Sequence, residues 1–269
     1  MIKKANIQNH LVLIIFSILS IFPMYWMVIS SLKSESEIFS FSLFPSDLTF
    51  SNYSYAFETM PLVKMLLNSV TISILTTAGQ LIIAILFAYA FTRWDFKFKG
   101  LIYLALSVTW LIPLQAIMVP NYVQINELGI NGTVWGIIVP GLCSVFANIY
   151  LYQSFNAFPK ALFDAARIDG ISEWRILVDI VLPNMKPTIA ALSIILIISS
   201  WNDYLWPMLV SRTLESSPIQ IGLKSFVSND SNLWGSLMAA TTISCIPIFI
   251  AYIILQRSIM DTFLKKGIK

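Results

Sequence analysis

Charged residues are scarce in this sequence. Aspartate, glutamate, lysine and arginine make up 12% of the 269 residues, whereas hydrophobic residues make up 57%. The mean hydropathy is +0.76. Soluble domains are about 25% charged, so this composition excludes an ordinary soluble protein and indicates an all-α membrane protein.

Histidine and cysteine are also rare, with one histidine and two cysteines in the chain. His10 precedes the first apolar stretch, and Asp203 is the one acid inside an apolar stretch. A membrane enzyme usually needs clustered His, Cys, Asp or Glu side chains for a metal or an acid–base pair. A polytopic membrane enzyme is therefore only a remote alternative. Cys143 and Cys245 both lie in apolar stretches, which argues against a structural disulfide.

Apolar stretches long enough to cross a bilayer occur six times. A spanning helix needs about 20 mostly apolar residues. The predicted spans lie near residues 11–32, 66–92, 100–120, 134–155, 188–210 and 236–256. These lengths leave no room for a separate soluble domain, so we expect one bundle of six helices over residues 1–269.

The distribution of lysine and arginine predicts the orientation of this bundle, because these residues concentrate in cytoplasmic segments. With the N-terminus inside, 13 of the 17 fall on the inner side, including Lys3, Lys4 and Lys269. The four on the outer side are Lys33, Lys64, Arg212 and Lys224. Both termini and segment 159–187 are therefore expected in the cytoplasm. The net charge of +3 reflects this asymmetry and implies no nucleic-acid partner.

Segment 159–187 carries eight charged residues between two apolar stretches. Pro159 can open a helix. Gly170 is suited to end this helix in a left-handed conformation. Ser172 is a candidate N-cap for a second helix. We expect that helix to end at its prolines, Pro183 and Pro187. Two short helices outside the lipid would suit docking to a partner.

The same segment resembles the cytoplasmic "EAA" loop of ABC-importer permeases, in which Glu-Ala-Ala, Gly and Ile-x-Leu-Pro occur at fixed spacing. Here Asp replaces the first Glu, and all other types and spacings match. The residues that the resemblance marks for ATPase coupling are Asp164, Ala165, Ala166, Gly170, Ile180, Leu182 and Pro183. The sequence Ala-Arg-Ile-Asp-Gly is similar to the one found in the carbohydrate-uptake branch of these permeases, which includes the smaller maltose-transporter permease. The implied fold is the type I importer bundle of six transmembrane helices with a coupling-helix loop.

The resemblance also implies partners. These are a second permease subunit that forms a heterodimer with this chain in a bacterial cell membrane, two ATPases on the cytoplasmic side, and an extracytoplasmic solute-binding protein. The solute would be a mono-, di- or oligosaccharide or a glycerol phosphate, moved by alternating access. The sequence lacks a Gly-x-x-x-x-Gly-Lys-Ser/Thr phosphate loop, so ATP would bind the ATPase and this chain would need no cofactor. A permease for an amino acid, phosphate or peptide remains the nearer alternative.

The run Trp201-Asn202-Asp203-Tyr204 lies near the outer end of the fifth stretch. A carboxylate at membrane depth is costly and usually faces a polar cavity or a partner. Aromatic rings could stack on sugar rings while Asn202 and Asp203 bond hydroxyls, which would place the run on the translocation path. An interfacial aromatic belt is an equal alternative.

Shorter features complete the sequence pattern. Three pairs or triplets resemble further signatures of the same permeases, namely Ser31-Leu32-Lys33, Asn52-Tyr53 and Asn68-Ser69. The outer loop 33–64 between them is expected to fold onto the helix ends. The second stretch carries small and polar residues that are typical of close helix packing. They are Thr71, Ser73, Thr76, Thr77, Gly79 and Gln80.

Overall fold

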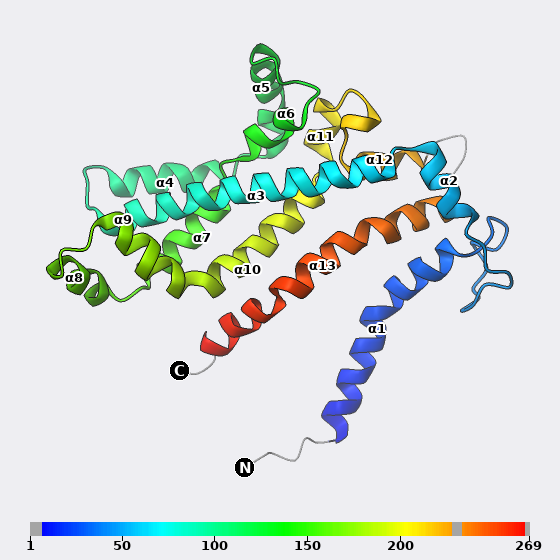
Figure 1. Ribbon diagram of the computed structural model, residues 1–269, viewed down its shortest axis with the longest axis horizontal. Helices are drawn as coiled ribbons and strands as arrows, with labels where there is room; N and C mark the ends of the chain where they lie inside the picture. Colours follow the sequence, from blue (N-terminus) through cyan, green and yellow to red (C-terminus); the bar gives the residue numbers. More distant parts are fainter. Residues whose placement is uncertain (1–6, 228–232, 267–269) are drawn as a thin grey trace. The chain divides into compact units, whose positions relative to one another are not determined.

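The computed structural model describes residues 7–227 and 233–266, and most of them are helical (Figure 1). The predicted all-α class is confirmed. Lys3, Lys4 and Lys269, which were counted on the inner side, lie outside the described residues. The chain divides into two compact units, which are described separately. Met1–Lys64 and Ile221–Ile246 form unit 1, and Met65–Gln220 and Pro247–Lys269 form unit 2.

Unit 1 contains α1 (Ile7–Ser31) and α2 (Ser51–Thr59), together with the end of α12 (Ile219–Ser225) and the first part of α13 (Trp234–Lys266). The loop between α1 and α2 is held by two buried polar side chains. Lys33 Nζ donates to the carbonyl oxygens of Ser40 and Ser42 at 3.1 and 2.8 Å. Asn52 Nδ2 donates to the carbonyl oxygens of Ser31 and Lys33 at 3.0 and 2.8 Å. Two of the short signatures therefore meet in space.

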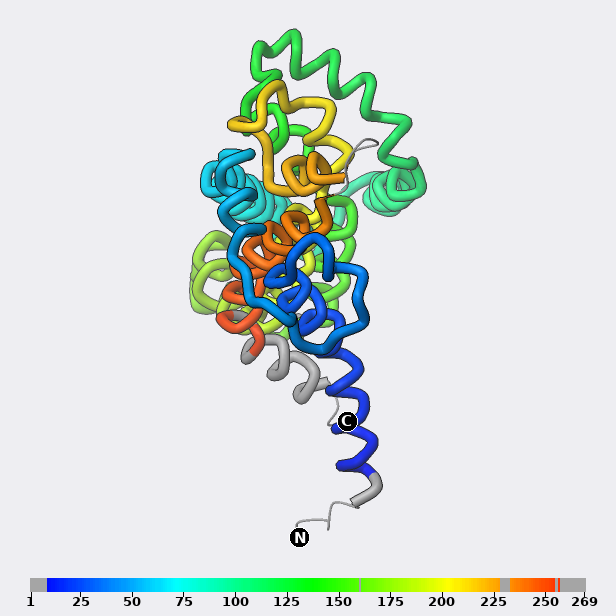
Figure 2. Tube along the Cα trace, turned by 90° about the vertical axis from the view of Figure 1, so that its right-hand side faces the viewer, coloured from blue at the N-terminus to red at the C-terminus, as the bar shows by residue number. Residues whose placement is uncertain are grey.

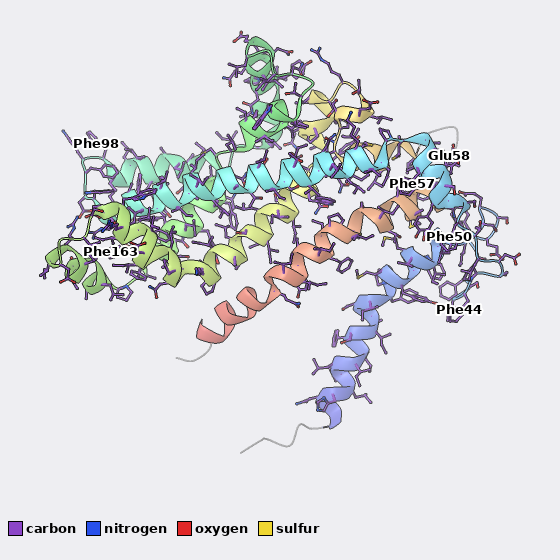
Figure 3. The ribbon with its side chains drawn as sticks, viewed as in Figure 1. Phe44, Phe50, Phe57, Glu58, Phe98 and Phe163 are labelled. Carbon is purple, nitrogen blue, oxygen red and sulfur yellow. The ribbon has the colours of Figure 1, made fainter. Side chains whose placement is uncertain are left out.

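Several aromatic side chains of this loop and of α2 are largely exposed. Figure 3 labels Phe44, Phe50 and Phe57 at the surface of unit 1, where 71%, 69% and 50% of each residue is exposed. The buried Lys33 and Asn52 side chains hold the loop in unit 1, and Phe41 also stacks on Trp26 of α1 with ring centres 5.3 Å apart.

Unit 2 holds most of the helices. In chain order they are α3 (Leu62–Arg93, which begins in unit 1), α4 (Lys99–Thr109), α5 (Leu114–Glu127), α6 (Val134–Ile138), the 3-10 turn η1 (Val139–Gly141), α7 (Val145–Asn156), α8 (Lys160–Ile168), α9 (Glu173–Arg175), the π-helical stretch η2 (Ile176–Val181), α10 (Leu182–Trp201), α11 (Leu205–Val210) and the 3-10 turn η3 (Leu214–Ser216). The second part of α13 also belongs to this unit.

The core of unit 2 lies where α3, α7 and α10 pack together. Ala84 and Ala88 of α3 are fully buried among Leu151 and Phe155 of α7 and Leu192 of α10. Alanines on one helix let the larger side chains of its neighbours come close to its backbone. This packing brings the C-terminal half of α3 beside the α7–α10 region that carries segment 159–187.

Within the described residues, four helices are long and apolar enough to cross a membrane, and six spans result if each of two bent pairs counts as one. One pair is α4 with α5, bent by 97° (Figure 2). The other is α6 and η1 with α7, bent by 43°. The break between α4 and α5 falls at Pro113, whose ring disfavours helical geometry in the preceding residue. Stretch 100–120 is thus not one straight helix.

The expected end of the second helix in segment 159–187 is wrong. The helix passes both prolines, and Glu173–Trp201 forms one span of 29 residues. Pro183 lies in the first turn of α10, directly after the π-helical stretch η2. A proline costs least in a first turn, and a π-helical segment already shifts the hydrogen-bond ladder. Pro187 is accommodated inside α10.

Candidate functional site

Helix α8 begins and ends as its sequence predicts. Pro159 precedes its first residue with extended backbone, at φ −60° and ψ 118°. Gly170 has a φ of +71°, and the amide N–H of Ile171 donates to the carbonyl oxygen of Ala166 at 3.0 Å. This left-handed ending favours glycine. A Cβ at Gly170 would meet nothing within 4 Å, so the conformation and not the space requires glycine.

The two faces of α8 differ sharply. Phe163 and Ala166 face the interior of unit 2, with 2% and 4% of each residue exposed. Asp164 and Ala165 are exposed, and Ile168 is 87% exposed. The three-residue spacing of Phe163 and Ala166 puts both on one helix face. Of the predicted coupling residues on α8, the outer surface therefore presents Asp164 and Ala165, while Ala166 anchors the helix.

The remaining predicted coupling residues lie on the turn after α8 and on the helix that follows. Gly170 is exposed at the turn. Ile180 and Leu182 are half-buried and pack against the core of unit 2, whereas Pro183 is exposed. The Ile-x-Leu-Pro part of the motif thus anchors the start of α10, and the Asp-Ala-Ala part carries the outward surface.

A carboxylate joins segment 159–187 to α3. Glu173 of α9 binds Arg93 at the end of α3 through both oxygens, from Nη2 to Oε1 and from Nε to Oε2, each at 3.2 Å. Arg167 Nη2 of α8 lies 2.7 Å from Oε1 of the same carboxylate. The Tyr89 hydroxyl donates to Oε2 at 2.6 Å. We call Tyr89, Arg93, Arg167 and Glu173 the Glu173 network.

The Glu173 network lies over the buried face of α8. The Arg93 guanidinium carbon is 4.4 Å from the centre of the Phe163 ring, a cation–π contact. Figure 3 labels Phe163 where α8 meets this region. The Arg93 side chain is only 8% exposed, and the Glu173 side chain is 33% exposed. The carboxylate therefore holds α8, α9 and α3 together in one arrangement.

Sequence reasoning did not identify this network. Arg93 and Glu173 are 80 positions apart. Taken singly, the sequence around each residue indicates only a solvated charge at a helix end. The one local signal was the placement of Glu173 directly after the candidate N-cap Ser172, where acidic residues are favoured. Nothing in the one-dimensional pattern paired it with α3.

The predicted translocation-path residues occupy the break between α10 and α11. Trp201 is buried with 5% exposed, Asn202 is exposed, and Asp203 and Tyr204 are half-buried. Asn202 Nδ2 donates to the carbonyl oxygen of Ile198 at 2.9 Å, a bond within its own helix. Of the four, Asp203 lines a cavity in unit 2. The structure thus brings one of the four predicted side chains to a potential solute site.

That cavity has a volume of about 540 Å³, within the range of about 300–1,000 Å³ typical of small-molecule sites. Ser69, Thr76 and Gln80 of α3 reach it from one side, and Ser199 and Ser200 of α10 from another. Gln80 Nε2 donates to the carbonyl oxygen of Gly141 at 2.6 Å, which fixes its amide. The sequence pattern favoured helix packing as the role of Thr76 and Gln80, so their position at the cavity is an additional finding.

The third short signature, Asn68-Ser69, lies in unit 2, as the cavity does. Asn68 Nδ2 donates to the carbonyl oxygens of Glu215 and Ser217 at 2.9 and 3.1 Å. Ser69 Oγ accepts the amide N–H of Ile219 at 2.8 Å. These contacts fix the loop after α11 against α3. Over residues 7–227 and 233–266, no group of three or more His, Cys, Asp or Glu could hold a metal ion.

Comparison with known proteins agrees with these features. Residues 80–261 match the family described as binding-protein-dependent transport system inner membrane component. The lactose transport system permease protein LacG of Rhizobium radiobacter is 30% identical over 262 residues, covering 97% of this chain and 96% of that protein. The sn-glycerol-3-phosphate transport system permease protein UgpE of Brucella abortus is 31% identical over 264 residues, covering 94% of each.

A solved structure shares the fold. It is the crystal structure of a bacterial ABC transporter involved in the import of the acidic polysaccharide alginate, which aligns with a TM-score of 0.80 at 24% identity and covers 93% of this chain and 95% of that one. The family match spans more than half of the chain, and the two relatives match over 97% and 94% of its length. This chain therefore belongs to the family of binding-protein-dependent transport system inner membrane components, and it is a multi-pass membrane permease rather than an enzyme.

Proposed function

We propose that this chain is one of two non-identical permease subunits of a bacterial ATP-binding-cassette importer that carries a sugar. Relatives named for lactose and for sn-glycerol 3-phosphate support the solute class. An extracytoplasmic binding protein delivers the solute, and two ATPase subunits bind on the cytoplasmic side. The sequence carries no phosphate loop, so ATP binds those partners.

The observation that carries the proposal is the outward face of α8. Ile168 is 87% exposed beside the exposed Asp164 and Ala165, while Phe163 and Ala166 fix the opposite face. An apolar side chain with small and acidic neighbours at the end of an anchored helix suits a groove on a partner. Asp164 would pair there with a basic side chain of the ATPase, and Ala165 leaves room for close approach.

Transport would follow from displacement of α8. When the ATPases close on ATP, they move α8, and the Glu173 network transmits this movement to the end of α3. Glu173 also begins the continuous helix Glu173–Trp201, which leads to Asp203 and the cavity. The bundle then changes between inward-facing and outward-facing states, each favoured by different partners.

Both termini and α8 are proposed to lie in the cytoplasm, from the 13-to-4 distribution of basic residues. Ser51 and Ser172 are both exposed, so a cysteine at either position can be reached by a reagent. In intact cells an impermeant maleimide should label Ser51→Cys and not Ser172→Cys. Labelling of position 172 without cell lysis would contradict this topology.

The central experiment is purification of the tagged chain from its host with its bound partners. We expect an ATPase and a second permease to copurify, and we expect sugar uptake after reconstitution with the binding protein. Ile168→Asp and Asp164→Lys should each release the ATPase while the permease pair stays in the membrane. Asp47→Lys makes the same charge change at an exposed loop residue and should retain it. Retention of the ATPase by both α8 variants would refute the docking surface.

A further inference from the structure

The cavity beside Asp203 has an unusual balance of charge. Its lining includes one carboxylate, that of Asp203, and contains no lysine, arginine or histidine among the described residues. Asp203 forms no ion pair anywhere in 7–227 or 233–266. Any solute that enters therefore meets a negative charge that no neighbouring cation balances.

The rest of the lining suits hydroxyl groups and ring faces. Thr76, Gln80, Ser199 and Ser200 supply side chains that can donate and accept hydrogen bonds. Trp110 and Trp206 supply aromatic surface. A few polar groups set among apolar walls is the usual composition of a small-molecule site.

Several of these side chains are held in place by the fold. The Trp206 indole N–H donates to the carbonyl oxygen of Gly136 at 3.2 Å, and the residue is 6% exposed. The Gln80 amide is fixed on Gly141. Asp203 itself lies directly before Tyr204, the N-cap residue of α11. The indole of Trp206 and the amide of Gln80 are therefore oriented before a solute arrives.

We propose that this cavity is a contact site for an uncharged sugar and that it discriminates against anionic solutes. The inference rests on the proposed function, because it assumes that the solute passes through this chain. A sugar hydroxyl can donate to the Asp203 carboxylate in a charge-assisted hydrogen bond. A phosphate or a uronate carboxylate would instead be repelled, with no cation in the lining to offset the repulsion. The cavity therefore favours a solute of the lactose kind over glycerol phosphate or an acidic polysaccharide.

Cys143 offers a direct probe of this charge, since it is a free, exposed cysteine in the lining. In the purified importer with Cys245→Ala, Cys143 would be treated with methanethiosulfonates of similar size that carry either a trimethylammonium or a sulfonate. At low ionic strength the cationic reagent should react faster by roughly threefold or more, relative to the same pair on a free thiol. Asp203→Asn should remove this preference.

Asp203→Asn is a suitable variant because asparagine has nearly the same size as aspartate and the N-cap of α11 is Tyr204, so α11 should remain in place. Asp47→Asn is the matched control, since it neutralises an exposed acid that does not line the cavity. It should leave the reagent preference unchanged. A preference that survives Asp203→Asn would overturn the electrostatic part of the proposal.

The second measurement uses solutes in the same importer, reconstituted in proteoliposomes with its binding protein. Lactose, L-arabinose and sn-glycerol 3-phosphate would be tested at equal concentration for protection of Cys143. We expect at least one sugar to slow labelling and glycerol 3-phosphate to have no effect. Protection by glycerol 3-phosphate, or by none of the three, would overturn the proposal. Uptake measured in the same vesicles separates this proposal from the proposed function. If the unmodified importer takes up no sugar at all, the proposed function is refuted rather than the role of the cavity.

Discussion

Neutralising Glu173 should disconnect α8 from α3 without unfolding either helix. Glu173→Gln keeps the length of the side chain but removes the charge that Arg93, Arg167 and Tyr89 share. Arg93 would then lie 8% exposed against the Phe163 ring without a carboxylate. The cost is the loss of the charge-assisted bonds to a nearly buried guanidinium.

The magnitude follows from the exposure of each partner. Hydrogen bonds to charged groups contribute about 1.5–3 kcal/mol, and breaking a fully buried ion pair costs about 3–5 kcal/mol. Because the Glu173 side chain is 33% exposed, the lower part of this range applies. Arg167 is 49% exposed, so its share is below about 1 kcal/mol. We expect a total of about 2–3 kcal/mol, or a roughly 30- to 150-fold larger population with α8 released.

Hydrogen exchange and coupled ATP hydrolysis together test this expectation. In the purified importer, amides of α8 should exchange roughly 30-fold faster or more in Glu173→Gln. Stimulation of the ATPase by the loaded binding protein should fall, while the ATPase still copurifies because the outward face of α8 is unchanged. Arg167→Gln is the graded control and should change exchange by less than about fivefold.

A double-mutant cycle separates a specific pair from general destabilisation. Arg93→Gln combined with Glu173→Gln should cost clearly less than the sum of the two single changes, since each removes the same bonds. Additive effects, or a Glu173→Gln importer with unchanged exchange and coupling, would refute the role of the network in positioning α8.

Three further changes test local features of the fold. Gly170→Val should cost about 1–2 kcal/mol through the left-handed backbone and should lower coupled ATP hydrolysis, whereas Gly170→Asn should be tolerated better; equal activity of the two would contradict the conformational argument. Gly136→Ala would place a Cβ 2.7 Å from the backbone carbonyl oxygen of Ile130 and should lower the free energy of unfolding in detergent by about 1–3 kcal/mol. Gly100→Ala, whose Cβ would meet nothing within 4 Å, should leave that free energy unchanged. Lys33→Met should leave the carbonyls of the loop after α1 unpaired and increase protease cleavage there, and wild-type resistance of that loop would show that the buried lysine does not hold it.

The order of residues along the chain was enough to predict the class of the protein and the local structure of α8. Apolar stretches of spanning length, a lack of charge and a motif with fixed spacing are properties of adjacent residues, which one-dimensional patterns capture. Gly170 belongs to this group, since its left-handed backbone follows from the local ending of one helix. The continuous helix through Pro183 and Pro187 does not belong to this group. A π-helical stretch directly before Pro183 and the continuation of α10 past Pro187 are not visible in the order of residues.

The packing of helices that are far apart in the chain brings together the charges and polar groups that act as a unit. Arg93 and Glu173 meet only because α3 packs along α7 and α10, and that packing depends on alanines facing larger side chains. Asp203 was found from the sequence as a lone acid, but its cavity requires side chains of α3 that lie more than 120 positions away. Such long-range meetings are fixed by how helix faces fit together, which the order of residues along one helix does not specify.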